Sequence, residues 1–132
     1  MFSTRIATQI YAKICFETTL GQKKIIEKLS EYLAGDDFSR IFVLNGFAGT
    51  GKTTLIAALV AALKELRIKP VLLAPTGRAA KRLAELTETD TFTIHSLLGW
   101  DLESNTFTKT EQDPLIVDLL IIDEFSMVDS WL

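Results

Sequence analysis

A short segment near the middle of the chain carries the residue types and spacing that bind nucleotide phosphates. Gly46-Phe-Ala-Gly-Thr-Gly51-Lys52-Thr53 fits the pattern G-x-x-x-x-G-K-[ST] at every fixed position. Its glycines let the backbone curl so that successive N–H groups point at phosphate oxygens, and the lysine reaches the β- and γ-phosphates. The alternative is a glycine-rich turn with a chance lysine, but this segment follows an apolar run and opens an amphipathic pattern. We therefore predict nucleotide contacts from Gly46, Phe47, Ala48, Gly49, Thr50, Gly51, Lys52, Thr53 and Thr54.

Two carboxylates complete the chemistry that a bound nucleotide requires. Asp123 and Glu124 follow the apolar run 119–122, which would carry them to the carboxyl edge of a sheet, where the ligands of parallel sheets collect. We expect Asp123 to hold Mg²⁺, together with the Thr53 hydroxyl. We expect Glu124 to orient and deprotonate the attacking water. With Lys52 at the phosphates, these residues predict ATP and Mg²⁺ as ligands and hydrolysis as the reaction.

Apolar patterning predicts the elements that position these groups. Strands that alternate with helices favour right-handed βαβ crossovers, so the expected fold class is α/β with a parallel sheet. Apolar runs typical of strands covered on both faces lie at 41–44, 71–74 and 119–122. Helices are expected within 1–16, at 20–33 between a Thr19 cap and Gly35, from Lys52 or Thr53 to Leu66, and at 78–86. Ser104-Asn105 predicts the turn of a small hairpin.

The composition fits one ordinary domain. The chain has 132 residues, of which 48% are apolar and 23% charged, which is enough for one core and too little for two. No stretch has the roughly 20 apolar residues that a membrane span needs. The single cysteine, Cys15, cannot form an internal disulfide, which favours a reducing, cytoplasmic setting. Its apolar neighbours predict a buried thiol.

The net charge of −3 hides an asymmetry along the chain. Residues 1–82 carry 13 Lys and Arg against 6 Asp and Glu, whereas residues 83–132 carry 1 against 11. The basic part is able to face phosphates while the acidic part does not, so the acidic balance does not exclude a nucleic-acid partner. It does argue against a protein that binds polyanions over its whole surface.

Four stretches together resemble one family of proteins. GFAGTGKTT (46–54), APTGRAAKRL (74–83), TIHSLLG (93–99) and IIDEFSMVD (121–129) are similar to motifs I, Ia, Ib and II of superfamily 1 helicases of the RecD-like 5′→3′ branch. Gln22, ahead of them, resembles the adenine-reading glutamine of that family. The resemblance implies one P-loop NTPase domain of the RecA-like motor type over 1–132. Within it we expect a helical segment at 1–35 and a P-loop core at 40–132.

The resemblance also implies that motifs Ia and Ib lie along single-stranded DNA. The contact residues carried over are Thr76, Gly77, Arg78, Thr93 and His95. A Pro-Thr-Gly turn that opens a helix offers a hydroxyl and N–H groups to a backbone phosphate, and Lys81 and Arg82 add charge nearby. Taken without the resemblance, 78–82 is a solvated basic face and His95 a packed structural histidine. Trp100 is then a core residue rather than a base-stacking one.

Further expectations concern the whole protein. The family couples ATP hydrolysis to translocation and duplex unwinding with two motor domains, and the strand after motif II inserts between the P-loop strand and the motif II strand. We therefore expect a sheet truncated after the motif II strand, and little ATP hydrolysis by residues 1–132 alone. Subunits of an exonuclease complex are expected partners by analogy. The alternatives are a P-loop kinase or small NTPase, which would need a substrate-specificity loop in place of 74–83, and a non-catalytic ATP- or DNA-binding module.

Overall fold

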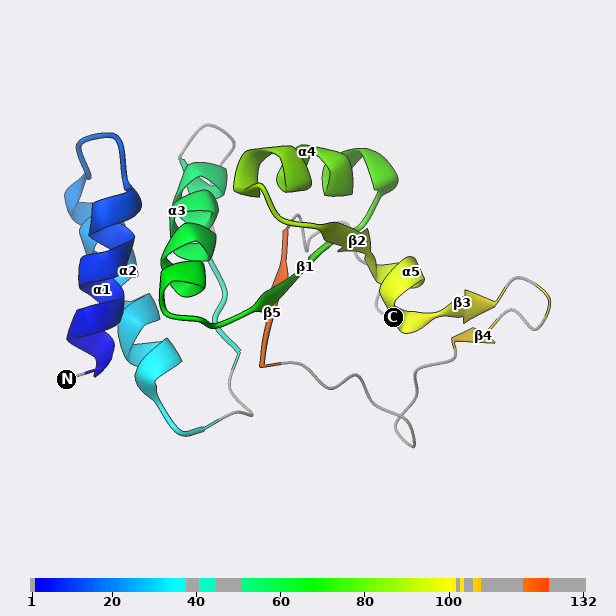
Figure 1. The fold of residues 1–132 in the computed structure, drawn as a ribbon, viewed down its shortest axis with the longest axis horizontal. Coiled ribbons are helices and arrows are strands. Elements are labelled where there is room, and N and C mark those ends of the chain that lie inside the picture. The colour runs from blue at the N-terminus through cyan, green and yellow to red at the C-terminus, as the bar shows by residue number, and fades with distance from the viewer. Residues whose placement is uncertain are drawn as a thin grey trace. The chain divides into compact units, whose positions relative to one another are not determined.

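The computed structural model of the chain describes residues 2–37, 41–44, 51–101, 103, 106–107 and 118–123 (Figure 1). These residues belong to two units, Met1–Ile68 and Lys69–Leu132. The fold is α/β, as predicted, with helices in the first unit and a three-stranded parallel sheet in the second. No helix within these described ranges is long and apolar enough to cross a membrane.

The core of the first unit lies between its helices. α1 (Phe2–Lys13) packs against both α2 (Leu20–Ala34) and α3 (Lys52–Glu65), drawn in blue, cyan and green in Figure 1. Ile6 and Ile10 of α1 are completely buried, and burying such side chains stabilises the fold by about 1.5–3 kcal/mol each. The other buried apolar residues of the unit are Ile26, Leu29, Leu55, Ala58, Leu59, Val60, Ala62 and Leu63.

The ends of α2 and α3 confirm the predicted boundaries. α2 begins after its N-cap Thr19, and Gly35, whose N–H donates to the Tyr32 carbonyl oxygen at 3.2 Å, ends it. α3 begins at Lys52, directly after the glycine-rich segment, and ends at Glu65. An ion pair links α3 to α1, with 3.1 Å between Lys13 Nζ and Glu65 Oε1. Because the two side chains are 32% and 58% exposed, solvent screens the pair, which contributes only about 0–1 kcal/mol.

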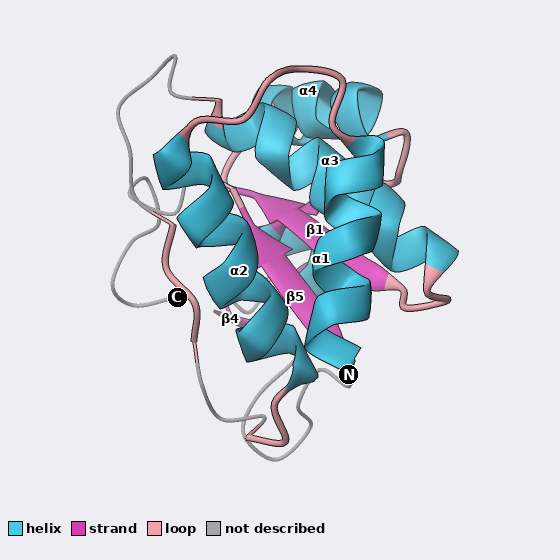
Figure 2. Ribbon diagram, turned by 90° about the vertical axis from the view of Figure 1, so that its left-hand side faces the viewer, coloured by secondary structure: helices cyan, strands magenta, loops and turns pink. Residues whose placement is uncertain are grey.

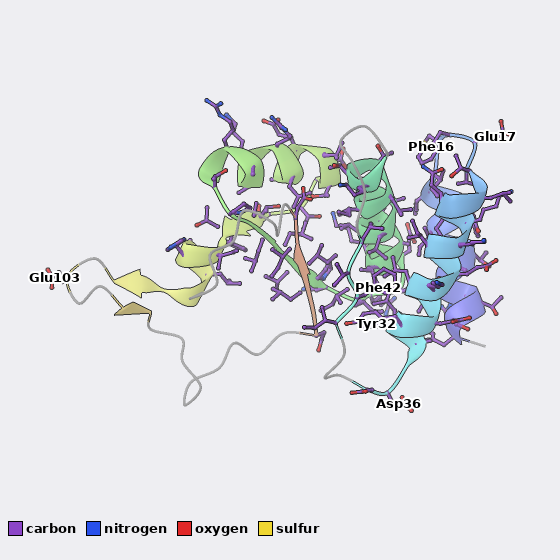
Figure 3. The ribbon with its side chains drawn as sticks, turned by 180° about the vertical axis from the view of Figure 1, so that it is seen from behind. Phe16, Glu17, Tyr32, Asp36, Phe42 and Glu103 are labelled. Carbon is purple, nitrogen blue, oxygen red and sulfur yellow. The ribbon has the colours of Figure 1, made fainter. Side chains whose placement is uncertain are left out.

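The prediction of a strand at 41–44 is wrong. These residues form neither helix nor strand, and Ile41 and Val43 are 86% and 68% exposed. Phe42 points toward α2 instead, with its ring centroid 5.5 Å from that of Tyr32 (Figure 3). The physical reason is strand pairing. An apolar run becomes a covered strand where a neighbour supplies its hydrogen bonds, and the described sheet pairs none of these residues.

The burial predicted for Cys15 is also wrong. Its side chain is exposed, and that of the adjacent Phe16 is 37% exposed. α1 ends at Lys13, so both residues lie in the connection to α2 rather than on a helix face that packs against a neighbour. Apolar neighbours in the sequence do not bury a residue that has left the helix.

The second unit is built on a parallel sheet. β1 (Pro70–Ala74) lies between β2 (Thr91–Thr93) and β5 (Leu119–Ile122). Both neighbours are parallel to β1, and Figure 2 shows β1 and β5 running side by side in one direction. β1 and β5 occupy the positions predicted from their apolar runs. The parallel arrangement brings the carboxyl ends of all three strands to one edge.

Burial differs between the central strand and β5. Leu72, Leu73 and Ala74 of β1 are all buried, and since successive side chains point to opposite faces, both faces of this strand are covered. β5 is less buried than predicted, with Leu120 39% exposed. The described sheet pairs β5 on one side only, through β1, so it has the exposure of an edge strand.

α4 (Gly77–Thr87) connects β1 to β2 and packs on both strands. It buries Ala80, Leu83 and Thr87 against them. Two short elements then follow that the sequence did not predict: β2 itself, with three residues, and α5 (Ile94–Leu98), with five. Elements this short do not establish a hydrophobic period.

The predicted hairpin is present after α5. β3 (Trp100–Asp101) pairs antiparallel with β4 (Thr106–Phe107), and Glu103 lies at the turn between them (Figure 3). The register joins Trp100 to Phe107 and Asp101 to Thr106.

Candidate nucleotide and nucleic-acid site

α3, the helix that follows the predicted phosphate loop, begins differently from the other helices whose N-caps are described. Its N-cap is Gly51, in a left-handed conformation with φ +84° and ψ 14°, and no side-chain hydrogen bond from the described residues caps it. α2, α4 and α5 begin instead at Thr19, Thr76 and Thr93, whose hydroxyls each accept a first-turn N–H. The first turn of α3 therefore depends on acceptors other than its own N-cap. A phosphate oxygen is the acceptor that such a helix end and its dipole favour.

Gln22 of α2 lies against Gly51. A Cβ added at Gly51 would stand 3.0 Å from Gln22 Nε2, so a side chain at this position requires the Gln22 amide to move by a few tenths of an ångström. The rest of the Gln22 side chain is held in place by Thr19: Gln22 Oε1 accepts from the Thr19 N–H at 2.9 Å, and Thr19 Oγ1 accepts from the Gln22 N–H at 3.1 Å. This reciprocal pair is a capping box. The structure thus brings together two residues predicted to bind nucleotide, Gln22 and Gly51.

Gly51→Ala is expected to lower the melting temperature and to weaken nucleotide binding. A side chain in the left-handed region costs about 1–2 kcal/mol, and the new Cβ would also displace the Gln22 amide. Gly21→Ala is the matched control, because its Cβ makes an ordinary contact, 3.8 Å from Thr19 Oγ1, and alanine favours a helix. Thermal melts and titration with a fluorescent ATP analogue measure both effects. Similar results for the two variants would contradict the expectation.

In the second unit, the carboxyl edge of the sheet collects residues from three predicted motifs. Asp123 follows β5 directly, and its N–H donates to the Leu73 carbonyl oxygen of β1 at 3.0 Å. On the other side of β1, Ala74 is in register with Thr93, the last residue of β2. Thr76 follows β1 by two residues and caps α4. Ligands of parallel sheets bind at this edge.

The hydroxyls predicted to contact DNA have structural roles. Thr76 Oγ1 accepts from the Ala79 N–H at 3.2 Å, and Thr93 Oγ1 accepts from the Ser96 N–H at 3.1 Å. A hydroxyl that accepts one hydrogen bond retains its O–H donor and a second lone pair. The capping bonds are therefore compatible with donation to a phosphate oxygen.

The remaining predicted DNA residues differ in exposure. Gly77 and Arg78 are exposed at the start of α4, and so are Lys81 and Arg82 further along it. This exposed basic face is opposite the face that α4 buries against the strands. His95 is half-buried on α5, and its carbonyl oxygen accepts from the Gly99 N–H. The basic face of α4 is thus available to a polyanion.

The structure describes part of the predicted nucleotide site. Lys52 and Thr53 are half-buried and Thr54 is exposed in the first turn of α3, and Asp123 is half-buried in the second unit. The loop residues Gly46, Phe47, Ala48, Gly49 and Thr50, as well as Glu124, lie outside the described residues.

The donor chemistry fits a magnesium ion. Each unit contains a hard oxygen ligand of the kind that Mg²⁺ prefers, the Thr53 hydroxyl in the first unit and the Asp123 carboxylate in the second. In the described part of the chain no three His, Cys, Asp or Glu side chains gather as a cage. An Mg²⁺ that accompanies a nucleotide does not require one, since it takes its other ligands from phosphates and water.

Sequence reasoning missed the capping box, although its signal was available. Thr19-Leu-Gly-Gln22 has the S/T-x-x-E/Q spacing of that motif, immediately before an amphipathic pattern. The spacing predicts that residue 22 folds back on residue 19. It does not predict that the Gln22 amide also reaches Gly51, because that contact joins segments 29 residues apart in the chain.

Comparison with known proteins identifies relatives of about two thirds of the chain. A family model described as an AAA domain matches residues 32–132. The ATP-dependent RecD2 DNA helicase of Deinococcus radiodurans is 42% identical over 89 residues, which cover 67% of this chain and 12% of that protein. The RecBCD enzyme subunit RecD of Haemophilus influenzae is 32% identical over 111 residues, 66% of this chain and 17% of the subunit. The ATP-dependent DNA helicase dda of Enterobacteria phage T4 is 38% identical over 92 residues, which cover 65% of this chain and 21% of that helicase. The chain therefore spans about a tenth to a fifth of the length of these relatives.

Proposed function

Because the chain belongs to the AAA domain family and is RecD-like in sequence, we propose that it forms the ATP-binding part of an ATP-dependent DNA helicase. The protein would couple ATP hydrolysis to translocation on single-stranded DNA and to duplex unwinding. The observation that supports this most directly is the start of α3, where a left-handed Gly51 without a side-chain cap follows a phosphate-loop sequence and lies against Gln22.

The proposed nucleotide roles follow from residue chemistry. Backbone N–H groups of 46–54 bind phosphate oxygens, and Lys52 supplies a positive charge to the β- and γ-phosphates. The Thr53 hydroxyl and the Asp123 carboxylate hold the Mg²⁺ that accompanies ATP. That ion supplies charge neutralisation at the phosphates. Gln22 presents its amide to the nucleotide, and Glu124 accepts the proton of the attacking water.

The proposed DNA roles belong to the second unit. Arg78 on α4 binds a backbone phosphate, and the O–H groups of Thr76 and Thr93 donate to neighbouring phosphate oxygens. Gly77 contributes its backbone N–H at the helix start, and His95 lies on the adjacent element. The curated relatives include subunits of a RecBCD enzyme, so partner subunits are a further part of the proposal.

ATP hydrolysis by the purified full-length protein tests this function. We expect single-stranded DNA to raise the steady-state hydrolysis rate, because a translocating motor turns over when its track is bound. A P-loop kinase or small NTPase would hydrolyse ATP at a rate that DNA leaves unchanged. A rate unaffected by DNA, measured with saturating ATP and Mg²⁺, would reject the helicase proposal while leaving nucleotide binding in place.

Arg78→Ala is expected to weaken single-stranded DNA binding with little dependence on sequence. Loss of one phosphate contact lowers the slope of log K against log [salt] by somewhat under one unit. Arg5→Ala is the matched control, since Arg5 is also exposed but lies on α1, outside the proposed DNA residues. Fluorescence anisotropy at several salt concentrations gives both slopes. If both variants bind as the parent protein does, the basic face of α4 is only a solvated surface.

A further inference from the structure

The Gln22 amide has two ends, and the structure shows what each one meets. Its oxygen, Oε1, accepts from the Thr19 backbone N–H at 2.9 Å. Its nitrogen, Nε2, lies on the side of Gly51, 3.0 Å from where a Cβ would stand. The amide therefore presents N–H donors, and not its carbonyl oxygen, toward the start of α3. The atoms of a nucleotide that such a donor recognises are acceptors: phosphate oxygens or ring nitrogens.

The orientation of this amide depends on residue 19. Thr19 is in an extended conformation (φ −74°, ψ 166°), which directs its N–H at Gln22 Oε1. The Thr19 hydroxyl secures that conformation, because it accepts from the Gln22 N–H at 3.1 Å. Without the hydroxyl, residue 19 loses the bond from the Gln22 N–H and keeps only the bond from the Lys23 N–H to its carbonyl oxygen, at 3.0 Å. The residue 19 N–H is then held less firmly against Gln22 Oε1.

We propose that Thr19 is a positioning residue for nucleotide binding, which acts by holding the Gln22 amide with its donors toward Gly51. The inference rests on the proposed function, since it requires a nucleotide at the start of α3. Thr19 is exposed and does not itself need to touch the nucleotide. Its effect on affinity passes through Gln22, so it should vanish when the Gln22 side chain is removed.

The test measures the affinity of the purified protein for a fluorescent ATP analogue, together with the melting temperature without nucleotide. Thr19→Ala should weaken binding about 3- to 10-fold, the equivalent of one neutral hydrogen bond. Thr19→Ser keeps a hydroxyl in the capping position and should restore the affinity. In a Gln22→Ala background, Thr19→Ala should have no further effect on affinity.

A control separates positioning from general destabilisation. Ile10 is completely buried on α1, which packs on α2 and α3, so Ile10→Val should lower the melting temperature about as much as the loss of a cap. It leaves the capping box intact, and we expect unchanged nucleotide affinity. If Ile10→Val weakens binding as much as Thr19→Ala, or if the Thr19 and Gln22 effects add in full, the inference is wrong. If Lys52→Ala binds as tightly as the parent protein, the nucleotide site itself is wrong.

Discussion

Glu124→Gln in the full-length protein is expected to leave ATP bound and to slow its hydrolysis by about 10²–10⁴-fold, the range of a positioned general base. Glutamine keeps the size and polarity of the side chain but does not accept a proton from water at neutral pH. Affinity for ATP should change little, because the role proposed for this residue is toward the attacking water rather than the phosphates. Single-turnover hydrolysis measured beside equilibrium binding tests both halves of this expectation.

Asp123→Asn is the informative comparison for that variant. Asp123 has been assigned a role in holding Mg²⁺, so its loss should raise the Mg²⁺ concentration needed for half-maximal hydrolysis. Glu124→Gln should leave that concentration unchanged. A Glu124→Gln protein that hydrolyses ATP at the parent rate would show that the proton is accepted elsewhere.

Lys52→Ala is expected to reduce nucleotide affinity about 10- to 150-fold. A hydrogen bond that involves a charged group is worth about 1.5–3 kcal/mol, and the ammonium group supplies such a contact to the phosphates. Lys52 lies in the first turn of α3, where removal of its side chain leaves a good helix former and should not unfold the element. Titration with a fluorescent ATP analogue measures the loss.

The comparison for Lys52→Ala is Lys64→Ala, which removes an equal charge from the exposed end of the same helix. That variant should bind nucleotide as the parent protein does. If Lys52→Ala retains parent affinity, or if the two variants lose affinity equally, the phosphate-loop assignment has no support.

The parts of the fold that sequence reasoning predicted are those with local causes. α2 begins at a capping threonine and ends at a glycine, α3 follows the glycine-rich segment, and β1 and β5 are runs of apolar residues between turn signals. Each depends on residues within one or two turns of the boundary. The alternation of these elements along the chain predicted the α/β class, and the AAA domain match supports it.

The errors arise where the outcome depends on distant partners. The run 41–44 has the composition of a covered strand, but strand formation requires a neighbour whose hydrogen bonds it shares. Cys15 has apolar neighbours, but its exposure follows from where α1 ends. β2 and α5 are too short to show a period, and their positions depend on pairing with β1 and on the Thr93 cap.

The same limit applies to the candidate site. Residue types and spacing indicate which residues belong to it, since phosphate binding and metal binding need particular side chains at particular intervals, and these assignments stay predictions. Spacing did not predict that Thr76 and Thr93 use their hydroxyls as caps, or that Gln22 reaches Gly51. Those contacts depend on how one segment meets another.

The contact between Gln22 and Gly51 also restricts which substitutions these two positions tolerate during evolution. A side chain at position 51 meets two independent obstacles, the left-handed backbone and the Gln22 amide. A shorter residue at position 22 removes the second obstacle and leaves the first, so no single compensating mutation opens position 51 to other residues. Position 22 has no such double restriction, since its own backbone is helical. Among diverging descendants of this sequence, residue 22 should therefore vary before residue 51 does.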